Sequence, residues 1–288
     1  MSDALSQPMA SDTGHGDDDQ GSMPLLQLES VIKRFGGLAA VDNLSFSLHK
    51  GEILGVIGPN GAGKSTMVDL IGGATTPTSG TIFYQGHDIT GLPPHQRTHL
   101  GIARTFQIAQ PFKGLDVREN VMVGALFGQQ RLNRTQALHV ADEVLERVNL
   151  AHKATFKGDQ LTIADRKRLE IARALATDPQ LLLLDEVMAG LTPVEVAQAV
   201  ELIRQINTMG VTVLVIEHIV SAIASVSNRV LVLHHGRKIA EDEPAQVLSD
   251  PKVIEAYLGE RYAQKRTQES ASGLSTTKDD QQLSGGDS

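Results

Sequence analysis

A glycine-rich segment that contains a lysine and a serine reads GPNGAGKST from Gly58 to Thr66. It matches the spacing G-x-x-x-x-G-K-[ST], in which glycines let backbone N–H groups surround phosphate oxygens without interference from a Cβ atom. In this pattern Lys64 reaches the β- and γ-phosphates and Ser65 ligates Mg²⁺. A Gly-rich turn without a ligand is the alternative, but apolar strand-like and helix-like runs flank the segment, as the motif requires. The residues predicted to hold a nucleoside triphosphate are Gly58, Pro59, Asn60, Gly61, Ala62, Gly63, Lys64, Ser65 and Thr66.

An acid pair follows four leucines in LLLLDE, which places Asp185 and Glu186 at the carboxyl end of an expected strand. Open α/β sheets bind ligands beyond that end of their strands. We expect Asp185 to hold Mg²⁺ through water, and Glu186 to orient or deprotonate the water that attacks the terminal phosphate. An acid pair can also simply terminate a strand. Its occurrence with the phosphate-binding segment in one chain favours the catalytic interpretation.

A histidine ends a third apolar run, VLVIEH, so His218 is expected at the same sheet edge as the acid pair. A lone histidine is usually structural or solvated. Here the edge already carries predicted phosphate and metal ligands, so we predict that His218 contacts the γ-phosphate. The other nine histidines, including the pair His234–His235, have no such context and are assigned no role.

The elements that must position these residues are visible in the hydrophobic pattern. The runs ILGVIG, LLLLDE and VTVLVIEH are nearly continuous, which is typical of strands buried on both faces of a parallel sheet. NLSFSLHKGE and SGTIFYQGHDI alternate or carry turn residues, which favours antiparallel strands. Apolar residues on one face of Gln136–Leu150 predict a helix, and further helices are expected after Lys64, Asp165, Pro193 and Pro251. The order predicts an α/β fold with a mostly parallel sheet, an antiparallel β portion and an inserted helical lobe at about 108–178.

The composition is that of a globular core with polar ends. The chain has 288 residues, 41% of them hydrophobic, no cysteine and a net charge of −8. Residues 1–22 contain five Asp and no Lys or Arg, so the body is nearly neutral and shows no electrostatic footprint for nucleic acid. We expect 1–23 and 263–288 to be disordered and 24–262 to form the working domain. Neither a secretory signal nor an apolar run long enough to cross a bilayer is evident.

These motifs, in this order, resemble the nucleotide-binding subunit of an ATP-binding cassette (ABC) transporter, over about residues 24–260. The resemblance implies a P-loop NTPase fold with an ABC nucleotide-binding domain that binds ATP and Mg²⁺. It also implies roles that the residue types alone do not suggest. Phe35 in KRFGGLAAV is expected to stack on adenine, with Val41 also at the nucleotide. Gln107 in ARTFQ is expected to contact Mg²⁺ and the attacking water, and to sense the membrane partner.

In this family two subunits meet head to tail, and the LSGGQ helix start of one faces the ATP bound to the other. The corresponding residues here are Leu161, Thr162, Ile163, Ala164 and Asp165. The missing glycines restrict the approach of backbone to a phosphate, and Asp165 adds a negative charge unless it turns back to cap its helix. Thr192 also replaces the aspartate of the subunit-contact loop. We therefore expect a weakened contact, and hypothesise a second, non-identical ATPase subunit with unequal composite sites.

The segments RTFQIAQPFKGLDVRENVMVGAL and EVMAGLTPVEV resemble one branch of the family, which imports branched-chain amino acids and related polar solutes such as amides and urea. This implies two permease subunits, an extracytoplasmic solute-binding protein, and a peripheral location on the cytoplasmic face of the inner membrane. Phe112, Leu115 and Val117 are then expected to accept a coupling helix from a permease.

Three other functions are weighed against the importer. A soluble ABC ATPase acting on ribosomes or nucleic acid predicts two cassettes or a basic surface, and the chain has neither. An exporter or lipid-transport ATPase is separable by the membrane proteins that co-purify. An unrelated P-loop kinase or GTPase leaves Gln107, the helix start at Leu161 and His218 without a role.

Overall fold

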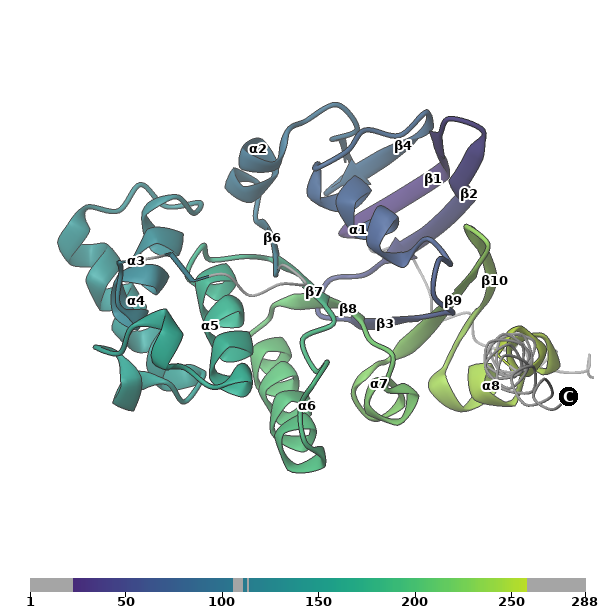
Figure 1. Ribbon diagram of the computed structural model, residues 1–288. Coiled ribbons are helices and arrows are strands. Elements are labelled where there is room, and N and C mark those ends of the chain that lie inside the picture. Colours follow the sequence, from purple (N-terminus) through teal and green to yellow (C-terminus); the bar gives the residue numbers. More distant parts are fainter. Residues whose placement is uncertain (1–22, 106–110, 113, 258–288) are drawn as a thin grey trace, which may run out of the picture.

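The computed structural model describes residues 23–105, 111–112 and 114–257, which form two sheets and a helical lobe (Figure 1). The polar ends predicted to be disordered lie outside these ranges, apart from Met23. Gln107 lies outside them as well. Within these ranges, each helix is too short or too polar to span a bilayer.

The larger sheet has the strand order β10–β9–β3–β8–β7–β6, and all its neighbouring strands are parallel except β9 and β10. Its strands are β3 (Ile53–Ile57), β6 (Ile102–Arg104), β7 (Leu181–Asp185), β8 (Thr212–Ile216), β9 (Arg229–His234) and β10 (Arg237–Asp242). Every residue of β3, β7 and β8 is buried, which confirms the prediction from their continuous apolar runs. Because these strands are parallel, their carboxyl ends share one edge.

The smaller sheet is antiparallel and has the order β2–β1–β4–β5. Its strands are β1 (Leu26–Phe35), β2 (Leu38–Leu48), β4 (Ser79–Tyr84) and β5 (His87–Asp88). The alternating segments that predicted antiparallel strands are β2 and β4, so that prediction is confirmed. Strand β1, which has no simple alternation, pairs with both of them from Leu26 onward.

Helices cover both faces of the larger sheet (Figure 1). The helix α1 (Lys64–Gly72) lies between the two sheets, and α6 (Pro193–Thr208) and α7 (Val220–Val226) lie on the opposite face. Successive residues of β3 point to opposite faces, so Leu54 and Val56 join one apolar core with α1 while Ile53 and Ile57 join the other. The last helix described as a separate element is α8 (Pro244–Ser249).

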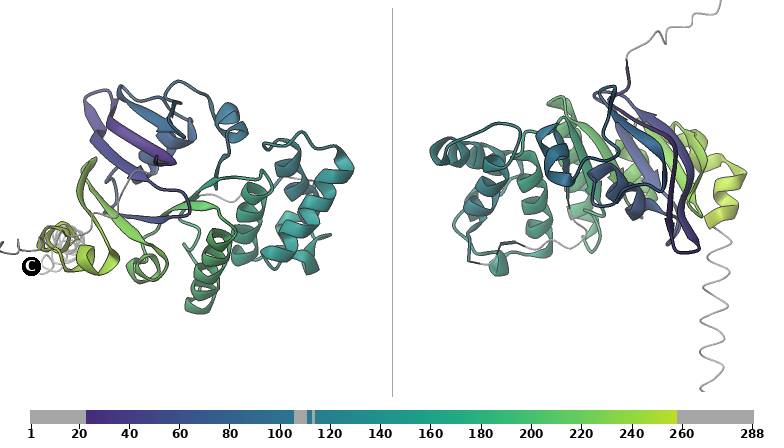
Figure 2. Two further views of the ribbon diagram at one scale, coloured as in Figure 1. Left: turned by 180° about the vertical axis from the view of Figure 1, so that it is seen from behind. Right: turned by 90° about the horizontal axis from the view of Figure 1, so that it is seen from above.

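The inserted lobe consists of helices and lies at the opposite end of the molecule from α8 (Figure 2). Its elements are α3 (Val117–Leu126), α4 (Arg134–Arg147), η1 (Ala151–Lys153), η2 (Gly158–Gln160) and α5 (Ile163–Leu175). The helix predicted from Gln136 is α4, and its Ala141, Val144 and Leu145 are buried as expected. The fold expected from the family resemblance is therefore confirmed.

A buried arginine joins α1 to the short helix α2 (Pro94–His99). The guanidinium of Arg97 is fully buried and donates to five backbone carbonyls, including Leu70 O at 2.6 Å and Ile71 O at 2.8 Å in the last turn of α1. These carbonyls have no intrahelical partner, so Arg97 caps the helix that begins at the phosphate-binding segment. Burial lowers the pKa of Arg97 to about 10, which leaves it charged at neutral pH.

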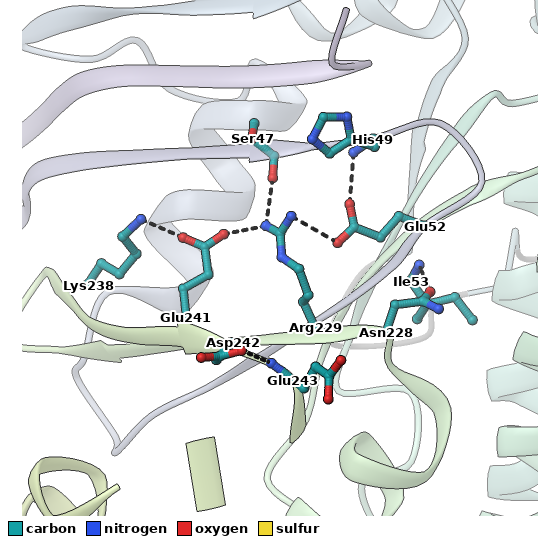
Figure 3. Close-up of polar contacts among 10 residues, drawn as sticks. All are labelled: Ser47, His49, Glu52, Ile53, Asn228, Arg229, Lys238, Glu241, Asp242 and Glu243. Atoms are coloured by element: carbon teal, nitrogen blue, oxygen red, sulfur yellow. Dashed lines mark hydrogen bonds and ion pairs between the residues drawn. The ribbon is translucent and has the colours of Figure 1, made fainter. Parts of the chain in front are cut away.

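A second arginine connects the two sheets at the edge where β3 and β9 begin, opposite the carboxyl ends of the parallel strands (Figure 3). Arg229 donates to Ser47 O at 3.1 Å and pairs with Glu52 at 3.4 Å and with Glu241. Beside it, Asn228 Oδ1 accepts the backbone N–H of Ile53 at 2.8 Å. This network stabilises the edge opposite the predicted site.

Candidate functional site

The phosphate-binding segment follows β3 and turns sharply into α1. Gly61 and Gly63 have φ of 77° and 102°, a region that side chains with a Cβ rarely adopt. A Cβ on Gly63 would also lie 2.3 Å from Ala40 O, and one on Gly58 would lie 2.2 Å from Leu233 O. Backbone from β2 and β9 thus packs directly against the loop, which explains why glycine is needed at these positions.

The loop presents positive groups to a cleft. Lys64 donates from Nζ to Gly58 O at 2.6 Å and to Pro59 O at 2.9 Å, so its ammonium group is held within the turn. Gly63, the residue before α1, has no side chain to cap the helix, and the first turn of α1 contains no acidic residue. Helix N–H groups left without an internal partner are a favourable site for a phosphate.

The cleft that this loop forms has a volume of about 470 Å³. Its lining residues are Leu38, Ala39, Ala40, Asn60, Gly61, Ala62, Gly63, Lys64, Ser65, Thr66, Glu186, His218 and His235. The structure therefore brings most of the predicted phosphate-binding residues together with Glu186 and His218.

Glu186 and His218 lie at the ends of neighbouring strands. Asp185 in β7 pairs with Ile216 in β8, and the backbone N–H of Glu186 donates to Ile216 O at 3.0 Å. The Nε2–H of His218 donates to Glu186 Oε1 at 2.7 Å. Glu186 has a φ of 52°, an uncommon value for a residue with a side chain, and Lys167 Nζ donates to its carbonyl at 2.8 Å. The backbone thus turns abruptly after β7 and directs the carboxylate into the cleft.

Asp185 is almost completely buried, and its Oδ1 has no hydrogen-bond partner among the described residues. Burial raises the pKa of Asp185 above its ordinary value, and Arg104, at 3.9 Å from Oδ2, opposes this increase. Asp185 does not line the cleft itself, whereas Ser65 does. A buried carboxylate oxygen without a donor and a serine hydroxyl are oxygen ligands of the kind that Mg²⁺ prefers. The residues present therefore fit a magnesium ion. Gln107, the third predicted metal ligand, lies outside the described residues.

Phe35, expected to stack on adenine, and Val41, also expected at the nucleotide, do not line the cleft. Phe35 ends β1 and is 54% exposed, with Lys33 Nζ 5.0 Å from its ring centre. The Val41 side chain is fully buried in the core around the antiparallel sheet. Leu38 and His235, which the sequence pattern did not single out, are cleft residues instead.

The helix start at Leu161–Asp165 is not part of this chain's own cleft. Thr162 caps α5, and Asp165 Oδ2 turns back to accept from Thr162 Oγ1 at 2.7 Å and from Lys153 Nζ at 2.6 Å. Burial alone would raise the pKa of Asp165, but the hydrogen bonds from Lys153 and Thr162 lower it overall. At the two positions where the family motif has glycines, Ile163 is 61% exposed and Ala164 is buried, and Leu161 is buried as well. The capping role that sequence left open for Asp165 is therefore the one observed.

A second cavity, of about 350 Å³, separates the lobe from α2 and β6. Phe112 lines it, and the guanidinium of Arg173 lies 4.3 Å from the Phe112 ring centre while pairing with Glu170 at 2.7 Å. Of the other two residues expected to meet a permease, Leu115 does not line the cavity and Val117 is fully buried within the lobe.

Comparison with protein families agrees with this arrangement. Residues 41–189 match the family described as ABC transporter, and residues 237–263 match one described as branched-chain amino acid ATP-binding cassette transporter. The high-affinity branched-chain amino acid transport ATP-binding protein LivG of Escherichia coli K12 is 39% identical over 253 residues, covering 83% of this chain and 99% of the relative. BraF of Pseudomonas aeruginosa, which carries the same description, is 37% identical with the same coverage.

This chain is also similar to solved structures of ATP-binding cassettes. A nucleotide-free ATP-binding cassette from an ABC transporter has a TM-score of 0.75 and 34% identity, covering 82% of this chain and 99% of that chain. A dimeric ATP-binding cassette in a post-hydrolysis state, bound to ADP and Pi, has a TM-score of 0.70 and 27% identity, covering 76% of this chain and 98% of that chain.

Proposed function

This chain belongs to the ABC transporter ATP-binding family and is an ATPase, and on that premise we propose that it powers an importer for branched-chain amino acids. The observation that carries the proposal is the cleft in which Lys64, Glu186 and His218 meet at one sheet edge. The two relatives described above, both named for branched-chain amino acid transport, support the substrate class.

The residues of the cleft suggest how ATP is hydrolysed. The backbone N–H groups of the loop and Lys64 hold the phosphates, where negative charge is stabilised most effectively. Glu186 orients the attacking water and accepts its proton, and His218 exchanges its hydrogen bond to Glu186 for one to the γ-phosphate. A Mg²⁺ ion held by Ser65, Gln107 and, through water, Asp185 would neutralise charge on the phosphate oxygens.

The second part of the proposal concerns the partner ATPase. The exposed start of α5 at Thr162 and Ile163 faces the ATP of a neighbouring subunit, and the absence of the two glycines weakens that contact. A complete cleft with a weakened trans contact favours a partner that is not identical to this chain. ATP binding then closes the dimer because the closed state binds ATP more tightly, and hydrolysis reopens it.

The third part concerns the membrane. We place the chain at the cytoplasmic face of the membrane, where one of the two permease subunits docks at the cavity between the lobe and α2. Phe112, exposed at 41% and positioned by Arg173, supplies an apolar contact there, and His95 and Thr98 of α2 supply polar ones. An extracytoplasmic binding protein delivers the solute and never contacts this chain.

Purification of the tagged chain from membranes, followed by reconstitution of the co-purifying subunits into vesicles, tests the proposal. ATP-dependent uptake of leucine, isoleucine or valine that is lost with Glu186→Gln is the expected result. Uptake of urea or an amide instead would replace the substrate class, and outward transport would contradict import.

A further inference from the structure

A buried glutamate next to His218 has no role in the mechanism derived above. Glu217 follows β8, is 1% exposed, and its Oε1 accepts the backbone N–H of Met188 at 2.6 Å. The backbone N–H of the neighbouring His218 also favours the charged form of this carboxylate and lowers its pKa. The side chain next to His218 therefore binds the backbone of the loop after β7, and His218 itself contacts Glu186.

This contact completes a set of links between the loops that follow β7 and β8. Two of the links involve Glu186 itself, through its N–H to Ile216 O at 3.0 Å and its carboxylate to His218 Nε2 at 2.7 Å. Neither of them holds the chain beyond Glu186. The hydrogen bond from the Met188 N–H to Glu217 holds the chain two residues beyond Glu186.

The position is costly for a carboxylate. Burial raises the pKa of Glu217 to about 7 and the charge of Glu186 raises it as well, whereas the Met188 and His218 N–H groups and Lys167 oppose the increase. An apolar residue would suit the end of a strand in which every residue is buried. A carboxylate that is unfavourable to bury, with its oxygen directed at a backbone donor, is suited to holding that donor in place.

We propose that Glu217 is a positioning residue that fixes the loop after Glu186 through Met188, and so aligns the Glu186 carboxylate and His218 with the terminal phosphate. Met188 is fully buried, so the loop is anchored on its apolar side by packing and on its polar side by Glu217. The inference rests on the proposed roles of Glu186 and His218.

Two substitutions separate positioning from packing. Glu217→Gln keeps an oxygen that accepts from Met188, and Glu217→Met keeps a similar length but replaces that oxygen with a thioether sulfur, which is only a weak acceptor. In the full chain with its partner subunits, we expect Glu217→Gln to stay within about threefold of the wild-type kcat. We expect Glu217→Met to lower kcat about tenfold while KM for ATP changes less than about twofold, because a misplaced catalytic group affects the transition state more than binding.

Glu241→Gln serves as the control, because Glu241 pairs with Arg229 at the opposite edge of the sheet (Figure 3). Its kcat should match the wild type. If Glu217→Met does not fold, Glu217→Asp is measured instead. It keeps a carboxylate but is one methylene shorter, so its oxygen is farther from the Met188 N–H. The inference is overturned if Glu217→Met, or Glu217→Asp in its place, has the same kcat as Glu217→Gln. It is also overturned if KM for ATP rises by the same factor as kcat falls.

Glu186→Gln, measured in parallel, distinguishes failure of this inference from failure of the proposed function. Loss of hydrolysis in Glu186→Gln with normal kcat in Glu217→Met contradicts the positioning role alone. Full hydrolysis in Glu186→Gln contradicts the assigned catalytic role and the inference together.

Discussion

His218 Nε2 lies 2.7 Å from Glu186 Oε1, although 32 residues separate the two in the chain. The contact follows from the parallel pairing of β7 with β8, which places Asp185 beside Ile216. Glu186 directly follows the first strand and His218 lies two residues beyond Ile216, so both lie at the same edge of the sheet. Both side chains thus line the same cleft as the phosphate-binding loop.

His218→Ala should leave ATP binding nearly unchanged and lower kcat about 10²-fold, because it removes a donor directed at the charge that develops on the terminal phosphate. His139→Ala is the matched control, since His139 is 77% exposed on α4, outside the cleft. Steady-state phosphate release against ATP concentration gives both constants. A rise in KM with normal kcat would assign His218 to binding alone.

Glu217 predicts a defined dependence of stability on pH. Its pKa is raised from 4.5 to about 7 in the folded protein, so folding binds a proton between these values and stability falls as pH rises through about 7. Glu217→Gln removes this titration. Relative to wild type it should add on the order of 1–3 kcal/mol at about pH 8 and close to nothing at about pH 4.5. Urea unfolding of both proteins at each pH measures the difference, and a difference independent of pH would contradict the prediction.

Arg97→Met should lower the free energy of unfolding by about 3 kcal/mol or more, because it removes a side-chain donor from five backbone carbonyls, three of them in buried hydrogen bonds. Arg147→Met on the exposed side of α4 should change it by less than about 0.5 kcal/mol. Equal unfolding midpoints for the two variants in urea would show that Arg97 is not the cap of α1.

Restoring the family motif by changing Thr162→Ser, Ile163→Gly, Ala164→Gly and Asp165→Gln should raise hydrolysis at the partner's site. The same change should reduce stability by about 1 kcal/mol for each glycine introduced into the first turn of α5. The increase should persist when this chain also carries Glu186→Gln, since the affected ATP is bound by the partner. An increase that disappears with Glu186→Gln would place the effect in this chain's own cleft.

Much of this architecture is predictable because continuous apolar runs specify strands buried on both faces, and their parallel ends must share an edge. The hydrophobic pattern alone therefore predicts that Glu186 and His218 lie at the same edge of the sheet. It could not distinguish Glu217 from its neighbour, because a carboxylate at a strand end gives no sequence signal of its burial. Arg97 was missed for the same reason, since its acceptors are backbone carbonyls and not acidic side chains. The roles assigned to the site residues, including Phe35 and Gln107, are predictions.

The central claim is that one cleft binds ATP through the Gly58–Thr66 loop and hydrolyses it through Glu186. Single-turnover hydrolysis of ATP by Glu186→Gln, with ATP affinity measured by calorimetry on the same sample, tests this most directly. We predict an affinity within about twofold of wild type and hydrolysis slower by about 10²-fold or more. Hydrolysis at the wild-type rate with unchanged affinity would contradict the account.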